Sequence, residues 1–184
     1  MSSNTQLEYK SVISYCRDLF LKKNKDYGTA WRILRLPSIT DQIYIKAQRI
    51  RSIQEKGKQM VNEEIDLEFV AMINYAIMAL IQLQLKDSTL MEIPVDQLTI
   101  LYDNEVERTY ELLMAKNHDY GEAWREMRVS SITDIILMKI FRTKQIEDNQ
   151  GLTIVSEGVD ANYRDMLNYA VFALIRSGFL NKIA

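Results

Sequence analysis

The chain has 184 residues, which fits one sizeable domain or two small ones that share a core. Its hydrophobic fraction of 47% excludes a disordered chain, and a formal net charge of -2 gives no basic excess of the kind that indicates nucleic-acid binding. Cys16 is the single cysteine, so no intramolecular disulfide can form, and we recognise neither a signal pattern nor an apolar run long enough to span a bilayer. We therefore expect a cytoplasmic protein that contacts no membrane and binds no nucleic acid directly.

The predicted elements are helices, because glycine occurs 6 times and proline twice, which leaves room for long uninterrupted segments. We predict a first helix over about residues 6–23, with the capping-box pattern Thr5-x-x-Glu8 at its start. A second helix is predicted to begin at the similar pattern Ser38-x-x-Asp41. A third helix, over residues 69–83, has apolar residues at the spacing of an amphipathic helix.

The first half of the chain recurs in the second half. Lys-Asn-Lys-Asp-Tyr-Gly at 23–28 returns at 116–121 with one change, and 13 of the 19 residues from 23 to 41 recur 93 positions later. After a one-residue insertion, Asn-Tyr-Ala at 74–76 returns at 168–170. A duplicated unit of this size usually cannot bury its apolar face alone, so we expect the copies to pack together.

The repeat predicts the architecture. Helices of the second copy are expected at about residues 96–115, 133–147 and 161–179. We predict an all-α protein of two tandem three-helix units that form an antiparallel bundle with a pseudo-twofold axis. The units cover residues 1–86 and 96–184, share one core, and are joined by a linker over residues 87–95.

Two interpretations fit the repeated block Lys-Asn-x-Asp-Tyr-Gly-x-Ala-Trp-Arg. In the structural one, Gly28 permits a turn, Asp26 caps the next segment and Trp31 packs in the core. In the functional one, the recurring cations clamp a phosphate and an aromatic ring stacks on a base. The candidate substrate-binding residues are Lys23, Asp26, Tyr27, Trp31, Arg32 and Arg35 in the first copy and Lys116, Tyr120, Trp124, Arg125 and Arg128 in the second, while Asp119 is a catalytic candidate.

A second basic feature lies on the second helix of each unit. Lys46 and Arg49, like Lys139 and Arg142, are three residues apart and so share a helix face. Each pair fits a solvated basic face or an anion site, and recurrence beside the arginine-rich block favours the anion site.

The carboxylates bear on whether a metal can bind. Glu157 and Asp160 recur in the first copy as Glu63 and Asp66, and both pairs also fit helix capping. Deeper in the third helix the copies differ, because Asp165 matches Ala71. Since Mg²⁺ prefers oxygen ligands, the candidate metal ligands are Glu157, Asp160 and Asp165.

The doubled block, the later Asp-x-x-x-x-Lys-x-x-Arg spacing and the final Asn-Tyr-Ala resemble the nucleotide-modification-associated domain 1 family, which is grouped with the MazG-like all-α nucleoside triphosphate pyrophosphatases. The resemblance implies a helical nucleotide site and Mg²⁺-dependent cleavage of a nucleoside triphosphate, with Mn²⁺ as a substitute. The sequence departs from the wider pattern, because Lys46 and Arg49 stand where an acidic Glu-x-x-Glu pair is usual.

We therefore expect a nucleotide-binding protein that acts as a Mg²⁺-dependent pyrophosphohydrolase, with Asp165 and Asp119 catalytic and Asn168 among the substrate-binding residues. Because only the second unit has the aspartate, we expect that unit to be the more active. The alternative is a catalytically inactive helical module that binds a nucleotide or a protein. Phe172, Phe179 and Leu180 are expected to leave an apolar patch, which predicts a homodimer.

Overall fold

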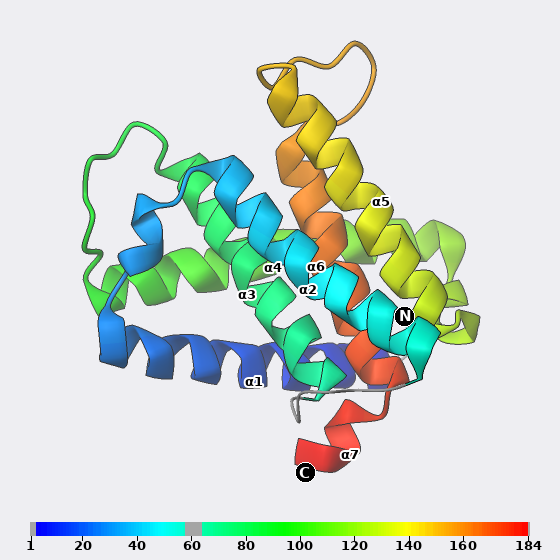
Figure 1. Cartoon of the computed structure of the whole chain (residues 1–184). Helices are drawn as coiled ribbons and strands as arrows, with labels where there is room; N and C mark the ends of the chain where they lie inside the picture. The colour runs from blue at the N-terminus through cyan, green and yellow to red at the C-terminus, as the bar shows by residue number, and fades with distance from the viewer. Residues whose placement is uncertain (1–2, 58–63, 184) are drawn as a thin grey trace.

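A computed structural model describes residues 3–57 and 64–183, and all of their side chains except those of residues 3 and 117–120. This part of the chain contains seven α-helices, two short 3-10 helices and no strand (Figure 1). The elements are α1 (Ser3–Tyr27), η1 (Ala30–Ile33), α2 (Leu36–Lys56), α3 (Ile65–Gln84), α4 (Val95–Tyr120), η2 (Ala123–Glu126), α5 (Val129–Asp148), α6 (Val159–Arg176) and α7 (Phe179–Ile183). The predicted all-α fold is confirmed, with α1–α3 and α4–α6 as the two units and the short α7 as an addition.

The repeated block forms the end of the first helix in each unit. α1 continues past Lys23 to Tyr27, so the Lys-Asn-x-Asp-Tyr segment is helical and not a turn. Gly28 ends the helix with a φ of +61°, in the left-handed region that glycine tolerates best, and its N–H donates to the Asn24 carbonyl at 2.8 Å. A Cβ at this position would also lie 2.6 Å from the carboxylate of Glu92, an exposed side chain that can move aside, so the positive φ is what favours glycine here.

Both predicted capping boxes are wrong. Thr5 lies inside α1, and its hydroxyl donates to the Glu122 carboxylate of the other unit at 2.6 Å. α2 begins at Leu36, ahead of Ser38, because Pro37 lacks an N–H and has a φ already suited to the first helical turn. Asp41 is exposed and forms an ion pair with Lys144. These polar side chains have partners far away in sequence, which local patterns do not reveal.

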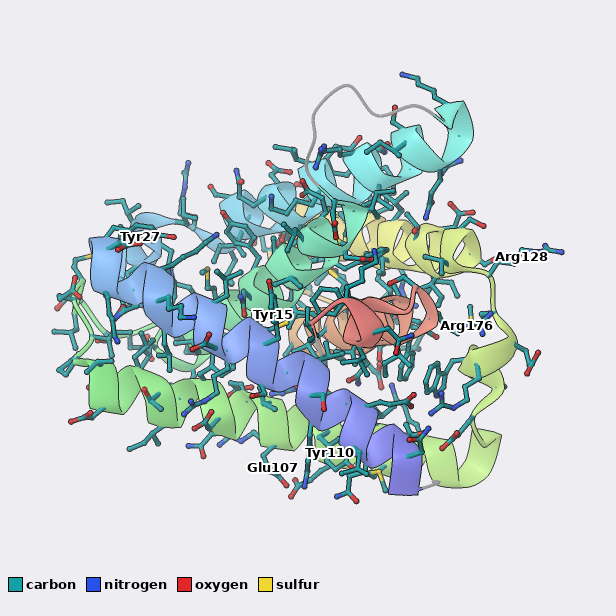
Figure 2. All side chains as sticks on the ribbon, turned by 90° about the horizontal axis from the view of Figure 1, so that it is seen from below. Tyr15, Tyr27, Glu107, Tyr110, Arg128 and Arg176 are labelled. Carbon is teal, nitrogen blue, oxygen red and sulfur yellow. The ribbon has the colours of Figure 1, made fainter. Side chains whose placement is uncertain are left out.

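The bundle is built from two antiparallel helix pairs, together with the long helices α1 and α4, which cross these pairs. α2 with α3 and α5 with α6 form the pairs, and they pack through α3 against α6 and α2 against α5 (Figure 1). α1 lies alongside α4 and covers another side of the molecule (Figure 2). Buried residues from both units form a single hydrophobic cluster, so the units share one core.

α3 is the most apolar helix of the core. By length and composition alone it could cross a membrane, yet 67% of its most apolar window is buried inside the protein. Phe69, Ile73 and Ile77 are fully buried on it. Contact with α2 and α6 therefore accounts for its apolar sequence.

The apolar residues expected to face solvent near the C-terminus are instead covered by the chain itself. Phe172 is 5% exposed and Phe179 is 2% exposed, and Leu180 packs partly buried against the core. The Phe179 ring meets the Tyr15 ring edge-on at 5.1 Å. The reason given for a homodimer is therefore wrong, and the homodimer itself stays a prediction.

Two buried hydrogen bonds connect the units reciprocally. The Tyr9 hydroxyl on α1 donates to Asn168 Oδ1 on α6, and the Tyr102 hydroxyl on α4 donates to Asn74 Oδ1 on α3, both at 2.9 Å. The tyrosines are equivalent in the repeat, as are the asparagines. The first helix of each unit is thus fixed to the third helix of the other.

The contact between α2 and α5 follows the same symmetry. The Thr40 hydroxyl is bonded to Glu147 at 2.7 Å, and in the equivalent place Gln54 donates to the Thr133 hydroxyl at 3.1 Å. Glu147 therefore occupies the position of a neutral glutamine in the other copy. Burial raises the pKa of the Glu147 carboxyl, and this outweighs the opposing effect of hydrogen bonds from Thr40 and Tyr163.

We predict that Tyr102→Phe lowers the free energy of unfolding by about 1–3 kcal/mol, because the buried Asn74 Oδ1 then loses its donor. The measurement is a urea unfolding curve. Tyr110→Phe is the control, because the buried Tyr110 hydroxyl has no hydrogen-bond partner among the described residues. Its effect should stay within about 0.5 kcal/mol. Equal effects of the two variants would contradict the role of the Tyr102 bond.

We predict that Glu147→Gln stabilises the protein at pH 7. A carboxyl with a raised pKa in the folded state stabilises that state below the unfolded pKa, and this contribution is lost as the pH rises through the folded value. Urea midpoints measured from pH 4 to 8 should fall less with rising pH in the variant than in the parent. Glu111→Gln, an exposed change on α4, should leave the parent's pH profile unchanged. The same dependence of the urea midpoint on pH in all three proteins would contradict the role given to Glu147.

Candidate functional site

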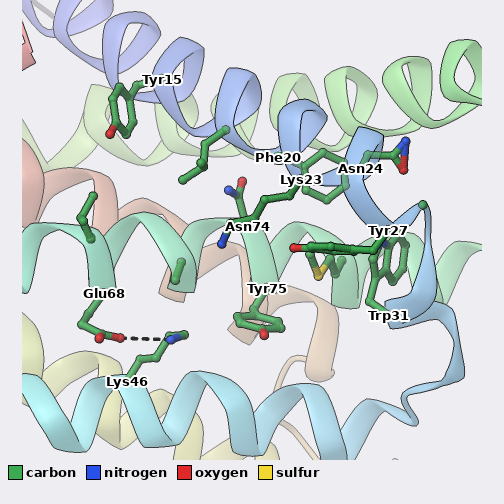
Figure 3. Close-up of a pocket in the computed structure, with 15 residues that line it drawn as sticks. Tyr15, Phe20, Lys23, Asn24, Tyr27, Trp31, Lys46, Glu68, Asn74 and Tyr75 are labelled. Carbon is green, nitrogen blue, oxygen red and sulfur yellow. Dashed lines mark hydrogen bonds and ion pairs between the residues drawn. The ribbon is translucent and has the colours of Figure 1, made fainter. Parts of the chain in front are cut away.

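The first unit contains a cavity of about 430 Å³ between α1, η1, α2 and α3 (Figure 3). This size lies within the range of small-molecule sites. Its aromatic lining comes from Tyr15, Phe20, Tyr27, Trp31 and Tyr75, and its polar lining from Lys23, Asn24, Lys46, Glu68 and Asn74. The cavity therefore combines stacking surfaces with two ammonium groups.

Helical spacing explains which residues face the cavity. On α1, Tyr15, Leu19, Lys23 and Tyr27 follow one another at intervals of four residues, so they form one stripe along the helix. On α3, the facing stripe consists of Glu68, Ala71, Tyr75 and Met78. The extension of α1 to Tyr27 completes the first stripe.

Lys23 is the cation without an acidic partner in this cavity. Its side chain extends from α1 toward α3 (Figure 3), and it forms no ion pair with any residue that the structure describes. Tyr27, at the end of the same stripe, is 57% exposed and stands at the cavity rim. Partial burial and the nearby Tyr75 raise the pKa of the Tyr27 hydroxyl, so this group stays neutral near pH 7.

The basic pair of α2 contacts a buried carboxylate. Lys46 lies 3.1 Å from Glu68 on α3, and Arg49 contacts the other oxygen of the same carboxylate. The Glu68 side chain is only 9% exposed, so the two cations offset the cost of burying its charge. Lys46 also faces the Tyr75 ring, with its ammonium 6.0 Å from the ring centroid.

The second unit has the same lysines with a different carboxylate. Asp165 on α6 accepts from Lys116 at 3.0 Å and from Lys139 at 2.6 Å. Partial burial is the largest single influence and acts to lower the pKa of Lys116, but the hydrogen bond and charge of Asp165, together with Glu157 and Tyr169, raise this pKa overall. Arg142, three residues after Lys139 on α5, is exposed. The predicted catalytic aspartate is therefore held in an ion-paired cluster.

The tryptophan of the second unit is covered by a neighbouring ring. Trp124 stacks on Phe172, with ring centroids 4.3 Å apart and planes 4° apart. Phe172 matches Met78, which lines the cavity of the first unit. The Arg125 guanidinium lies 4.4 Å from the centroid of the Trp124 ring. The indole face is thus already occupied by protein.

The repeated arginines do not converge on a cleft as predicted. Arg32 is buried and donates to the carbonyls of Leu90 at 3.1 Å and Ser88 at 3.0 Å, so it fixes the linker. Arg125 contacts Glu8 on α1 at 2.5 Å and Glu122 at 2.7 Å. Both guanidinium groups have protein partners where a phosphate was expected.

The remaining predicted phosphate ligands are solvent-facing. Arg35 and Arg128 precede the first residues of α2 and α5 and are exposed, and Arg128 points away from the protein (Figure 2). Asp26 is also exposed and does not line the cavity. Among the cations predicted for the first unit, the cavity therefore brings together Lys23 and Lys46.

The predicted metal ligands do not come together. Glu157 and Asp160 are exposed near the start of α6, while Asp165 is engaged by two lysines. Within residues 3–57 and 64–183, no group of three Asp, Glu, His or Cys side chains is arranged to hold a metal ion. The described residues of the second unit therefore do not assemble the predicted site, and its deeper carboxylate is paired with two ammonium groups.

Three further candidates have other outcomes. Asn168 accepts a hydrogen bond from Tyr9, so its side-chain oxygen serves the contact between the units. Asp119 and Tyr120 belong to the segment whose side chains lie outside the described part of the structure. Sequence reasoning missed Tyr15, Leu19, Ala71, Tyr75 and Met78 as lining residues, although their spacing on two helices was the available signal.

Comparison with known proteins agrees with the internal repeat. A family model described as nucleotide modification associated domain 1 matches residues 23–83 and, a second time, residues 116–176. No curated protein and no solved structure matches the chain.

We predict that Arg32→Met lowers the free energy of unfolding by about 1–3 kcal/mol, because two linker carbonyls and Gln82 lose their charged donor. Urea unfolding followed by circular dichroism measures the change. Arg35→Met is the matched control on the exposed side of the same turn, and it should shift stability by less than about 0.5 kcal/mol. A neutral Arg32→Met would show that the guanidinium does not hold the linker.

Proposed function

Because the chain belongs to the nucleotide modification associated domain 1 family, we propose that it binds a nucleotide in the cavity of the first unit. One observation supports this place above all: the cavity wall joins aromatic rings to Lys23, an ammonium group with no acidic partner among the described residues. Every nucleotide base has a π-face on which aromatic side chains can stack, and a phosphate is bound by cations.

The two ends of the cavity suit the two ends of a nucleotide. Tyr27 and Trp31, from the end of α1 and from η1, both line the cavity (Figure 3), where they offer ring surfaces for a base. Lys23 and Lys46 reach the cavity from α1 and α2 and offer ammonium groups for phosphate. The second unit offers less, because Phe172 covers Trp124 and Asp165 neutralises both lysines.

Metal-dependent pyrophosphohydrolysis, the finer activity that the resemblance implies, does not fit the groups of this cavity. Mg²⁺ usually takes one or two carboxylates together with substrate phosphates. Glu68 is the carboxylate in the cavity wall, and Lys46 and Arg49 already engage its oxygens. We therefore propose binding without a metal-dependent step, and a pyrophosphate-release assay with Mg²⁺ and Mn²⁺ tests this part directly.

We predict that Lys23→Gln weakens nucleotide binding by about 1.5–3 kcal/mol, because a charge-assisted hydrogen bond to phosphate is lost. Isothermal titration calorimetry with a panel of nucleotides in the presence of EDTA measures the affinity. Lys22→Gln is the control, because the adjacent Lys22 pairs with Asp18 on the exposed side of α1. Its affinity should equal that of the parent.

Two results would contradict the proposal. The first is no heat of binding from any nucleotide with the folded parent protein. The second is an unchanged affinity in Lys23→Gln, which would place the ligand elsewhere. Release of pyrophosphate by the parent with Mg²⁺ or Mn²⁺, lost in Asp165→Asn, would instead support catalysis by the second unit.

A further inference from the structure

The two units carry the same lysines but arrange their acids differently. Lys23 and Lys46 of the first unit correspond to Lys116 and Lys139 of the second. In the second unit a single carboxylate, that of Asp165, lies between both ammonium groups at 3.0 Å and 2.6 Å. The second unit therefore shows where an anion sits when this pair of lysines binds one.

No described carboxylate of the first unit lies in that place. The counterpart of Asp165 is Ala71, which lines the cavity together with Lys23 and Lys46. The acid of the first unit is Glu68, one helical turn earlier on α3, and it contacts Lys46 and Arg49. Lys23 is left without an ion pair in the described part of the chain, and space lies beside the Ala71 methyl group.

We infer that the space over Ala71, between Lys23 and Lys46, is the phosphate subsite, and that the ligand is a nucleoside monophosphate; the inference rests on the nucleotide site proposed above. A phosphate placed there accepts hydrogen bonds from both lysines, as the Asp165 carboxylate does in the second unit. The carboxylate of Asp165 thus takes the place of ligand phosphate in one copy, and Ala71 leaves that place open in the other.

The charge of the subsite selects the monophosphate. Lys23 and Lys46 bring two ammonium groups to the subsite, and Lys46 shares the Glu68 carboxylate with Arg49. A phosphate monoester, which carries about −1.5 to −2 charges at pH 7, can accept hydrogen bonds from both ammonium groups. A triphosphate brings further negative charge, which a metal ion usually neutralises, and among the described lining residues no carboxylate is free to hold such an ion.

The test copies the second unit's acid into the first. Ala71→Asp should place a carboxylate between Lys23 and Lys46, and so weaken the binding of nucleoside monophosphates at least about tenfold, the loss expected when a charge-assisted bond is removed. Ala71→Asn has the same size without the charge and should stay within about threefold of the parent. Calorimetry in EDTA with a nucleoside, its monophosphate and its triphosphate provides the three affinities for each protein.

The outcomes separate this inference from the proposed function. The parent should bind the monophosphate more tightly than the nucleoside or the triphosphate, and Ala71→Asp should remove the advantage over the nucleoside. Two results would overturn the phosphate subsite but leave the proposed nucleotide binding intact. One is tighter binding of the triphosphate than of the monophosphate in EDTA, and the other is an equal loss of monophosphate affinity in Ala71→Asn and Ala71→Asp. No binding of any of the three overturns both. If Ala71→Asp does not fold, Lys23→Gln must instead bind the monophosphate no more tightly than the nucleoside.

Discussion

The buried bond between Tyr102 and Asn74 fixes the wall of the cavity, and its counterpart between Tyr9 and Asn168 fixes the equivalent region of the second unit. Asn74 lines the cavity, and its amide also donates to the Cys16 carbonyl on α1 at 3.1 Å. One side chain therefore sets α3 against α1 and against α4 of the other unit. Because an unpaired buried amide is costly, this spacing is strongly specified. The first unit's cavity thus depends on the second unit even though no described residue of the second unit lines it.

Duplication has left two copies that share cations and differ in what the cations meet. In the second unit the internal aspartate and the Trp124–Phe172 stack satisfy the lysines and the indole. In the first unit Ala71 and Met78 occupy the equivalent positions, and both are cavity residues. The third helices therefore differ at these two positions, and also in having Glu68 where the second unit has Asn162. From Asp165 alone, the second unit was expected to be the more active one. We propose instead that Asp165 neutralises the lysines of the second unit and leaves the first unit to bind the ligand.

The sequence was sufficient for the fold because the repeat and the helical spacing are both periodic signals. The end of α1 was missed because Asn24 and Asp26 are poor helix formers, whereas packing against α3 and the linker carries the helix on to Gly28. The arginines were misassigned for a related reason: nothing in the local sequence shows that Arg32 meets the linker carbonyls or that Arg125 meets Glu8. A charge pattern gives the residues available for a site, and tertiary packing decides which of them remain unpaired.

Whether the ligand occupies the first unit's cavity can be read from the fluorescence of the two tryptophans. Trp31 lines the cavity, whereas Trp124 is stacked on Phe172 in the other unit. The measurement is a fluorescence titration with a nucleoside monophosphate on Trp124→Phe, which retains only Trp31, and on Trp31→Phe, which retains only Trp124. A ligand in the first unit's cavity should cause a saturable change in the emission of Trp31 and none in that of Trp124. A saturable change in Trp124 emission, with none in that of Trp31, would contradict this placement of the ligand.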